Sequence, residues 1–240
     1  MAWRRSASPG LLERITERPA LRLVGLWTHF ACAEDPLNPF TWEQYDRFLR
    51  ATGDGFPQAI RHVANSAAAL NFPKLGLDAV RAGLALYGIY PGPNVRRAVP
   101  LRPALSWKAT VLRVAELQAG EGVSYAPRFR TDRPRQIATL SVGYADGYRR
   151  TAMGRSWVLI QGRRAPVVGT VCMDAVVCDI TEIPGVRPGT VATLLGSDGK
   201  EALTAEELAR QWGTIPYEGT DRHRSARATT LLGRGDDSGG

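Results

Sequence analysis

Hydrophobic positions in the first hundred residues alternate between continuous apolar runs and stretches with helical spacing. The runs predict a buried strand over Leu21–Trp27 and a second strand over Ala59–Ala64. A third short apolar run covers Asp78–Tyr87. Helical spacing predicts helices over Leu11–Glu17 and Phe40–Ala51, and a third helix beginning at Asn65-Ser66. Strands followed in turn by helices are typical of parallel βα units.

The pattern changes after a linker predicted at Pro91-Gly92-Pro93 and Val99-Pro100. Short β-rich runs then follow one another, separated by Gly and Pro turns, over Leu105–Glu116, Gln136–Val142, Trp157–Ile160, Val167–Ile180 and Val191–Leu195. Such spacing predicts an all-β barrel or sandwich. One amphipathic helix is expected over Thr204–Trp212, with Thr204 as N-cap and Glu207 at the capping-box position. From Gly219 onward the chain is polar and Gly-rich, which predicts a disordered tail.

Composition excludes several classes of protein. The 240 residues are 44% hydrophobic and 22% charged, as expected of one large or two modest globular domains. No apolar run approaches the length of a membrane span, and the N-terminus shows no secretory signal. Three cysteines and three histidines lack metal-ligand spacing, and free thiols favour a reducing cytoplasm. We therefore expect a cytoplasmic protein with no metal site and no membrane partner.

The net charge of +8 lies within residues 101–164, which contain twelve basic and four acidic side chains. Basic density with interleaved aromatic residues is one mark of a nucleic-acid surface. A solvated, Arg-rich face gives the same pattern, and no known nucleic-acid-binding motif is present. A nucleic-acid partner is therefore not expected.

Two stretches of the first half combine residues that suit an anionic ligand. Asn65-Ser66 follows a predicted strand at a helix start, where free backbone N–H groups attract an anion. A plain Ser N-cap is the alternative. Arg81 lies in an apolar run shortly before Gly83, and a buried arginine needs a partner. An ordinary acidic residue on a neighbouring strand is the alternative there.

Two further stretches lie in the β-rich half. Tyr125 acts as a base only if nearby positive charge lowers its pKa, and most tyrosines on a β-rich surface serve packing. Cys172-Met173-Asp174 precedes an apolar run and by itself says little.

The order of these motifs is far more specific than any one of them. The series is His29-Phe30-Ala31, Asn65-Ser66-Ala67, Arg81-Ala82-Gly83, Ser124-Tyr125, Gly143-Tyr144-Ala145-Asp146-Gly147-Tyr148 and Cys172-Met173-Asp174. In sequence, spacing and order it resembles the pyridoxal-phosphate-dependent alanine racemases, from about Leu21 to Glu218. The resemblance implies an α/β plus all-β fold: a partial (β/α) TIM-type barrel over residues 1–100, made of the last three βα units, and a β domain over residues 101–218.

The resemblance also implies roles for individual residues. Ser66, with Asn65 beside it and the backbone of Gly83-Leu84, would hold the phosphate of pyridoxal 5'-phosphate, and Arg81 would face the pyridine nitrogen. His29 would connect Arg81 to the catalytic base Tyr125, which the partner subunit of a head-to-tail homodimer offers. Met173 and Asp174 would lie on the side of the substrate carboxylate, and Tyr144 would line the entrance. The implied reaction is the interconversion of L-alanine and D-alanine, which supplies D-alanine for peptidoglycan.

The sequence departs from the family in its lysines. The only three are Lys74, Lys108 and Lys200, and none stands in the family's Val-Lys-Ala-x-Ala-Tyr-Gly context. We therefore expect the Schiff-base lysine to be absent and the chain to be inactive alone. We also expect an N-terminus cut short, because a barrel takes roughly 250 residues. A frameshift near residue 219 would explain why the family's Thr-Gly-Ile-Gly-type segment does not follow Glu218.

Two other functions stay open at this point. One is a non-catalytic remnant that binds phosphate ligands or dimerises with an intact racemase. The other is a basic nucleic-acid-binding β domain, whose binding would depend steeply on salt. Action on serine or lysine instead of alanine is also compatible with the sequence.

Overall fold

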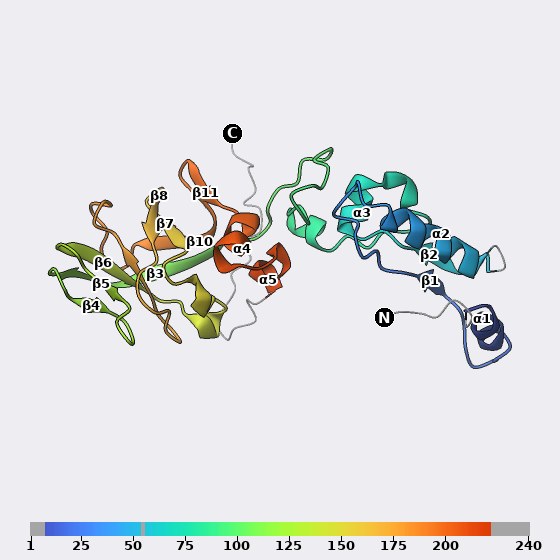
Figure 1. Cartoon of the computed structure of the whole chain (residues 1–240), viewed down its shortest axis with the longest axis horizontal. Helices are drawn as coiled ribbons and strands as arrows, with labels where there is room; N and C mark the ends of the chain where they lie inside the picture. The colour runs from blue at the N-terminus through green and yellow to red at the C-terminus, as the bar shows by residue number, and fades with distance from the viewer. Residues whose placement is uncertain (1–7, 54–55, 222–240) are drawn as a thin grey trace, which may run out of the picture. The chain divides into compact units, whose positions relative to one another are not determined.

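The computed structural model of the chain describes residues 8–53 and 56–221. These residues form two compact units, one ending at Ala104 and the other beginning at Leu105. We call them unit 1 and unit 2; Figure 1 colours unit 1 from blue to green and unit 2 from green to red.

Unit 1 alternates helices and strands in the predicted order. Its elements are α1 (Ser8–Thr16), β1 (Gly25–Trp27), α2 (Phe40–Thr52), β2 (Ile60–His62), α3 (Ser66–Asn71) and the 3₁₀ helices η1 (Pro73–Leu75) and η2 (Leu84–Tyr87). The strands β1 and β2 pair in parallel, with Gly25 opposite Ile60 and Trp27 opposite His62. The predicted parallel βα arrangement is therefore confirmed for these two strands.

The core of unit 1 lies between the helices and this short sheet. Phe30, Val63 and Phe48 of α2 are buried in one cluster with the start of α3. Ala67 and Ala68 are both 0% exposed, because a methyl side chain lets the helix approach the strand ends closely. The small residues after Ser66 thus fix the beginning of α3 against the sheet.

Two predictions for unit 1 are wrong. The strand expected over Leu21–Trp27 is only three residues long and is only partly buried, since Leu26 lies in the core but Trp27 is 62% exposed. In the described residues β1 has one strand neighbour, and a parallel sheet is buried only when strands and helices cover it. The run Asp78–Tyr87 forms no strand: a single bridge joins Arg81 to Asn65, and η2 follows.

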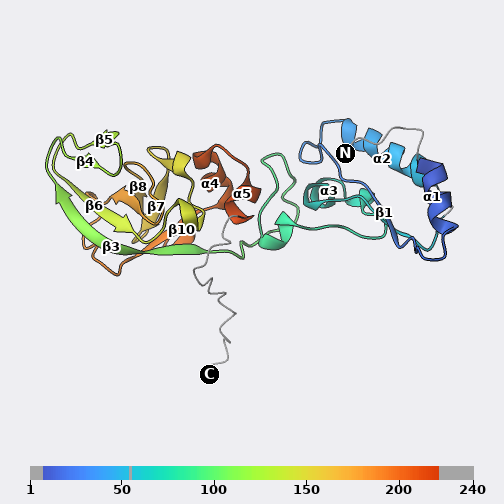
Figure 2. The same cartoon turned by 90° about the horizontal axis from the view of Figure 1, so that it is seen from below.

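Unit 2 is built on an antiparallel sheet with the strand order β8-β7-β10-β3-β6-β9, and β11 pairs with β10. Its strands are β3 (Trp107–Leu117), β6 (Arg135–Leu140), β7 (Trp157–Ile160), β8 (Arg163–Pro166), β9 (Val176–Asp179), β10 (Val191–Asp198) and β11 (Glu201–Leu203). Two further strands, β4 (Gly122–Val123) and β5 (Phe129–Arg130), form a separate ribbon. Two 3₁₀ helices, η3 (Tyr144–Asp146) and η4 (Arg150–Ala152), lie between strands. Figure 2 shows β3 running along the unit. One end of β3 pairs with β10 and the other with β6.

The sheet of unit 2 buries its own apolar residues. Val158, Leu159 and Ile160 of β7 and Leu194 of β10 are 0% exposed. The helix α4 (Ala205–Trp212) begins as predicted, because Thr204 Oγ1 accepts a hydrogen bond from Glu207 N over 3.2 Å. The Glu207 carboxylate accepts from Arg164 at 3.1 Å, so it also ties α4 to β8.

Two predictions for unit 2 need correction. The run Val167–Ile180 is not one strand: β9 covers its end, an isolated bridge joins Val167 to Cys178, and a loop lies between. The loop begins at Gly169, whose φ of +71° takes the chain out of the extended region. The predicted tail starts too early, because α5 (Pro216–Asp221) continues past Glu218; residues 222–240 lie outside the described part of the chain.

No helix among the described residues is long and apolar enough to cross a membrane.

Candidate functional site

The Arg81 side chain is the centre of a polar network in unit 1. Its guanidinium donates to the carbonyl oxygens of His62 (2.8 Å) and Thr28 (2.9 Å), and it lies 2.9 Å from His62 Nδ1 and 3.3 Å from His29 Nδ1. Its carbon Cζ lies 5.1 Å from the centre of the Trp27 ring. These partners are neutral. Arg81 therefore has the partners that the sequence analysis expected, but they do not include the alternative, an acidic residue on a neighbouring strand. Burial lowers the pKa of Arg81, which remains far above neutral pH.

The turn that carries His29 is held by α2. Gln44 Nε2 donates to His29 O over 2.7 Å and to Thr28 Oγ1 over 3.0 Å, while Gln44 Oε1 accepts from Ala31 N over 3.1 Å. One amide side chain thus satisfies three groups of the turn. Gln44 was missed by the sequence analysis, since its position on a helix face looks like that of any solvated glutamine.

Ser66 joins the start of α3 to the Gly83 turn and does not cap the helix. Asn65 is the N-cap of α3, and its Oδ1 accepts from Ala68 N over 2.9 Å. The cap alternative for Ser66 is therefore wrong. Ser66 Oγ instead accepts from the backbone N–H of Gly83 at 2.9 Å and of Ala85 at 3.3 Å. One hydroxyl and two N–H donors converge there, beside the exposed Gly83.

Tyr125 lies in unit 2 in a loop with an unusual backbone. Its neighbours Ser124 and Ala126 have φ of 62° and 44°, in the left-handed region that non-glycine residues rarely adopt. Thr170 holds the loop, since its Oγ1 donates to Tyr125 O over 2.9 Å and its carbonyl oxygen accepts from Ser124 Oγ over 2.5 Å. The Tyr125 side chain is 73% exposed, so it packs little against the rest of unit 2.

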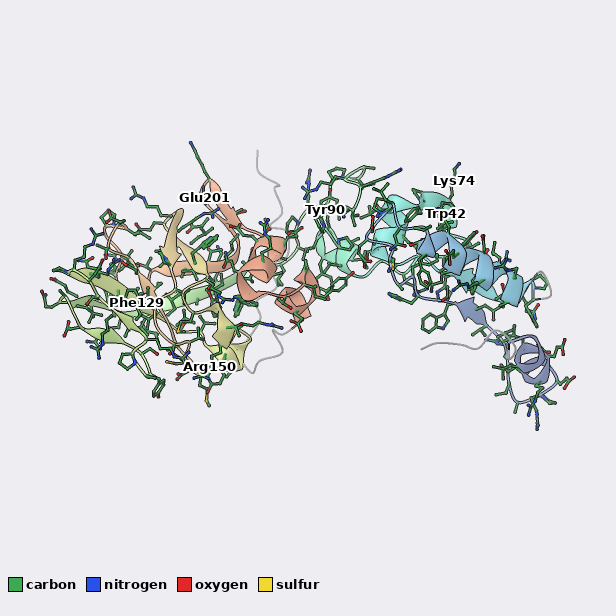
Figure 3. The ribbon with its side chains drawn as sticks, in the orientation of Figure 1. Trp42, Lys74, Tyr90, Phe129, Arg150 and Glu201 are labelled. Atoms are coloured by element: carbon green, nitrogen blue, oxygen red, sulfur yellow. The ribbon has the colours of Figure 1, made fainter. Side chains whose placement is uncertain are left out.

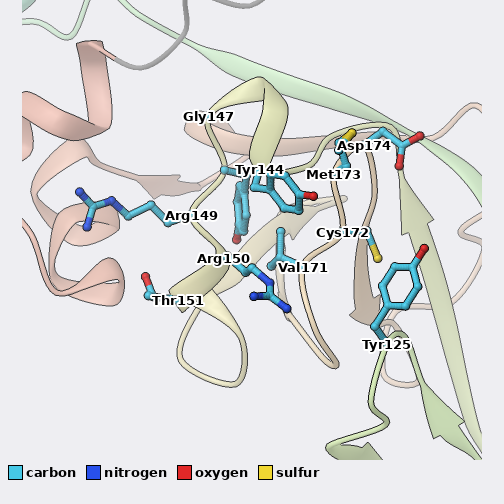
Figure 4. A pocket seen from close by; sticks show the side chains of 11 residues that line it. Tyr125, Tyr144, Gly147, Arg149, Arg150, Thr151, Val171, Cys172, Met173 and Asp174 are labelled. Atoms are coloured by element: carbon cyan, nitrogen blue, oxygen red, sulfur yellow. The ribbon is translucent and has the colours of Figure 1, made fainter.

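A cavity of about 1030 Å³ opens beside Tyr125. It is lined by Tyr125, Tyr144, Gly147, Tyr148, Arg149, Arg150, Thr151, Val171, Cys172, Met173 and Asp174. In the view of Figure 4 the Tyr125 hydroxyl points in the direction of the Cys172–Asp174 turn. The cavity therefore joins four predicted residues of unit 2: Tyr125, Tyr144, Met173 and Asp174.

The Met173–Asp174 turn is fixed by the Gly143 loop. Tyr144 N donates to Cys172 O and Ala145 N donates to Met173 O, both over 2.9 Å. A Cβ on Gly143 would lie 2.3 Å from the Met173 carbonyl carbon, so only glycine permits this approach. The Gly143–Tyr148 motif thus acts mainly as a frame for the turn.

The two tyrosines of this motif differ. Tyr144 is 43% exposed and lines the cavity, whereas Tyr148 is 0% exposed among Trp107 and Trp212. Tyr148 Oη lies 2.9 Å from Ser156 Oγ, and burial raises the pKa of Tyr148 far above its usual value. Tyr148 is therefore a core residue, although its phenol borders the cavity.

All three lysines are exposed: Lys74 in η1, Lys108 in β3 and Lys200 between β10 and β11. Figure 3 labels Lys74, which points out from the surface of unit 1. None of them lines the cavity beside Tyr125. Within the described residues, no cluster of three or more His, Cys, Asp or Glu side chains suits a metal ion.

Unit 1 thus brings Ser66, Gly83 and Arg81 together at the ends of its strands, and unit 2 is a β domain with an exposed tyrosine beside a cavity; a partial βα unit followed by such a β domain defines the class of fold. The family model "Alanine racemase, N-terminal domain" matches residues 4–91, and "Alanine racemase, C-terminal domain" matches residues 104–229. The chain belongs to the alanine racemase family, as its motifs indicated.

Individual relatives agree. The alanine racemase of Halothermothrix orenii is 40% identical over 87% of this chain and 56% of that protein. The structure of alanine racemase from Bacillus anthracis with bound L-Ala-P has a TM-score of 0.80 and 36% identity, over 90% of this chain and 57% of that one. Alanine racemase from Bartonella henselae, with covalently bound pyridoxal phosphate, gives a TM-score of 0.75 and 28% identity, over 88% and 58%.

These neighbours confirm the predicted fold class, a partial βα barrel followed by a β domain. The chain spans about half the length of the relatives that it matches. The predicted frameshift near residue 219 stays a prediction; the match to the C-terminal domain continues past that position, to residue 229.

Proposed function

We propose that this chain is part of a pyridoxal-phosphate-dependent alanine racemase, whose whole protein interconverts L-alanine and D-alanine and so supplies D-alanine for peptidoglycan. The observation that carries the proposal is the cradle at Ser66, where the N–H groups of Gly83 and Ala85 converge on one hydroxyl next to Arg81. The free thiols of Cys32, Cys172 and Cys178 fit the cytoplasmic location that belongs to this proposal.

The donor set suits the phosphate and the pyridine ring of this cofactor. A phosphate needs several N–H and O–H donors: Ser66 has a hydroxyl proton to give, and the N–H groups of Gly83 and Ala85, which donate to Ser66 Oγ in this structure, lie beside it with Leu84 between them. Arg81 offers a donor that cannot give up its proton to a ring nitrogen. When bound, the cofactor withdraws electrons from the α-carbon of the amino acid. Asn65 and His29 support the cradle, with Asn65 Nδ2 3.4 Å from His29 Nε2.

Unit 2 supplies the groups on the other face of the substrate. Tyr125 takes or returns the α-proton, Met173 and Asp174 lie on the carboxylate side, and Tyr144 lines the entrance. The exposure of Tyr125, Tyr144 and Met173 supports a homodimer in which each chain offers this surface to its partner. His29 then connects Arg81 with the partner's tyrosine, and the positive network favours the phenolate.

Racemisation needs a second proton-transfer group on the opposite face of the α-carbon. None of the three lysines of this sequence lies at the cradle-forming contacts or in the tyrosine cavity. We therefore propose that the chain by itself binds the cofactor but does not racemise alanine. The amine must come from a lysine-bearing segment outside this sequence.

Binding is tested with pyridoxamine 5'-phosphate, which has no aldehyde and cannot label surface lysines. We expect saturable binding in equilibrium dialysis, weakened at least tenfold by Ser66→Ala because the hydroxyl and its ordering of two N–H groups are lost. Ser197→Ala, the same change at an exposed position of β10, is the matched control. Absence of binding by the unchanged chain would refute the cradle.

Activity is tested by D-alanine formation from L-alanine with added pyridoxal phosphate. We expect none from the chain alone, and recovery when it is co-expressed with the part of the Halothermothrix orenii relative that this chain does not cover. Binding without recovery would instead identify a non-catalytic remnant. Binding of DNA or RNA that depends steeply on salt would favour the basic nucleic-acid-binding domain.

A further inference from the structure

Two segments of the site in unit 2 lie far apart in the sequence and meet at Thr170. Tyr125 lies on the loop between β4 and β5, which we call the tyrosine loop (residues 124–128), whereas the Met173–Asp174 turn lies shortly before β9. Figure 4 shows both segments beside the cavity that they line. Thr170 Oγ1 donates to Tyr125 O over 2.9 Å, and the Thr170 carbonyl oxygen accepts from Ser124 Oγ over 2.5 Å. The proposed function gives Thr170 no task, although its contacts join the two segments.

The Thr170 hydroxyl is buried, and its single proton has one good acceptor. Thr170 is only 7% exposed. Its Oγ1 lies 2.9 Å from Tyr125 O and 3.7 Å from Met153 Sδ, and a thioether sulfur is a much weaker acceptor than a carbonyl oxygen. A buried hydroxyl that lost this carbonyl would be left unsatisfied, at a cost in stability. The hydrogen bond to Tyr125 O is therefore favoured in the single chain.

The tyrosine loop needs such support because its backbone is strained. Ser124 and Ala126, on either side of Tyr125, have φ of 62° and 44°. Residues with a Cβ rarely adopt the left-handed region, and they stay there only where surrounding contacts compensate the strain. Packing of the phenol supplies little of that compensation, since Tyr125 is 73% exposed. The backbone that carries the phenol therefore depends on its hydrogen bonds with Thr170.

The chain just before Thr170 packs directly on the start of the tyrosine loop. A Cβ on Gly169 would lie 2.8 Å from Val123 Cγ1 and 2.9 Å from Val123 O, and the φ of Gly169 is +71°, so only glycine fits there. Val168 and Val123 are buried in the same hydrophobic cluster. The two loops thus begin side by side at one packed base, which leaves Thr170 little freedom to move relative to the tyrosine loop.

The chain just after Thr170 has contacts with both segments. Cys172 Sγ lies 3.2 Å from Ser124 Oγ, and Cys172 O accepts from Tyr144 N over 2.9 Å. The second contact belongs to the same set of hydrogen bonds that fixes the Met173–Asp174 turn. The short segment from Thr170 to the turn is therefore tied to the tyrosine loop at one end and to the frame of the turn at the other.

We propose that Thr170 is a positioning residue, which fixes the tyrosine loop relative to the Met173–Asp174 turn and so sets where the phenol stands beside the substrate. Its relevance to racemisation rests on the proposed function, but the contacts themselves exist in the single chain. Thr170 does not line the cavity and acts through the backbone of Tyr125. Since proton transfer is sensitive to displacements of about 1 Å, a loosened loop slows the reaction without weakening the binding of alanine.

Two substitutions separate this role from simple packing. Thr170→Val has nearly the same shape and no hydroxyl, whereas Thr170→Ser keeps the donor. In the isotope-labelled full chain, NMR three-bond couplings across φ distinguish left-handed from extended backbone at Ser124 and Ala126. We expect left-handed values in the unchanged protein and in Thr170→Ser, and averaged values in Thr170→Val, because the strained loop loses the hydrogen bond that holds it. Thr139→Val, the same change at a half-buried position of β6, should leave the couplings unaltered.

Ser124→Ala provides the same test should Thr170→Val fail to fold. It removes only the hydrogen bond to the Thr170 carbonyl oxygen, and it should shift the same couplings in the same direction by a smaller amount. Left-handed couplings that persist in every folded variant would overturn the positioning role.

Kinetics then connect the position to the reaction. The full chain is co-expressed with the part of the Halothermothrix orenii relative that it does not cover, and racemisation of alanine is measured. We expect Thr170→Val to lower kcat about tenfold and to change KM by less than about twofold, because a displaced phenol affects proton transfer and not the binding of alanine. Thr170→Ser should retain kcat to within about threefold of the unchanged protein.

The outcomes distinguish the role of Thr170 from the proposed function. Should the assembled protein be inactive while the couplings behave as described, the support of the tyrosine loop by Thr170 stands and the proposed function fails. An unchanged kcat in Thr170→Val, or a rise in KM alone, would overturn the positioning role and leave the proposed function intact.

Discussion

The two units differ in how completely their strands bury apolar side chains. In unit 2 the antiparallel strands cover their own core, and Leu159, Leu194 and Val158 are 0% exposed. In unit 1 the parallel pair β1–β2 leaves Val24, Trp27 and Ile60 more than half exposed. Antiparallel strands pair through short local turns, whereas parallel strands depend on elements from far along a chain. A β domain is therefore structurally more self-sufficient than part of a βα barrel.

Truncation of one leucine in each unit, buried in unit 2 and exposed in unit 1, gives the largest expected contrast. Leu194→Ala in β10 should lower the free energy of unfolding of unit 2 by about 3 kcal/mol, because the lost side chain leaves a cavity in a closely packed sheet. Leu86→Ala in η2 of unit 1 removes a side chain that is 75% exposed, and should change stability by less than about 0.5 kcal/mol. Urea titration with hydrogen exchange by region measures both, and equal effects would contradict the comparison.

A glycine pair gives the next largest contrast. Gly143→Ala should destabilise unit 2 by about 2 kcal/mol, because the new Cβ meets the Met173 backbone and must displace the turn. Gly10→Ala in α1 of unit 1 meets nothing within 4 Å and should be neutral or slightly stabilising. Thermal unfolding measures stability, and amide NMR shifts at Met173 and Asp174 report the displacement. Unchanged amide shifts in Gly143→Ala would show that the Gly143 loop does not pack closely against the Met173–Asp174 turn.

The loss of stability in acid gives the smallest contrast, and the two units lose stability in different pH ranges. Asp179 is partly buried, which by itself raises its pKa, but hydrogen bonds from Thr181 and Arg135 outweigh this and hold the pKa below its usual value. A carboxyl with a depressed folded-state pKa adds stability above the unfolded value of about 3.9, and that stability is lost as the pH falls further. We therefore expect unit 2 to lose stability as the pH falls below about 4.

In unit 1 the corresponding group is His62, whose pKa is lowered below the unfolded value of 6.5. Between these two pKa values the unfolded chain binds more protons, so stability falls as the pH drops below about 6.5. Urea midpoints measured from pH 8 to pH 3 should thus show two windows. Asp179→Asn should flatten only the lower one and His62→Asn only the upper one.

Much of the fold was predictable because it follows local patterns. The helix over Phe40–Ala51 and the strand Trp157–Ile160 match α2 and β7 within one residue at each boundary, since periodicity and flanking turn residues set them. The wrong predictions concern contacts between elements that are distant in sequence. Leu21–Trp27 has the apolar composition of a buried strand, but only three of its residues pair with another strand. The short strands β4, β5 and β11 carry too few residues to show a period, and β8 (Arg163–Pro166) lacks an apolar run.

The candidate site was predictable where a motif specifies a backbone arrangement. Ser66 and Gly83 meet through a hydrogen bond of 2.9 Å, and Tyr125 and Met173 line one cavity. Gln44 and Trp27 escaped notice because their contribution comes from contacts across the fold rather than from sequence neighbours. His62 also escaped notice, and only the 2.9 Å distance from its Nδ1 to Arg81 shows that it belongs to the network.

The left-handed backbone on both sides of Tyr125 has a consequence for how chains meet. Each such residue costs roughly 1 kcal/mol or more, and the hydrogen bonds with Thr170 sustain that cost in the lone chain. The Tyr125 phenol is therefore exposed to solvent on a backbone that is already held in place in the single chain. Any contact made through this phenol would lose little backbone entropy, because the backbone that carries it is already ordered.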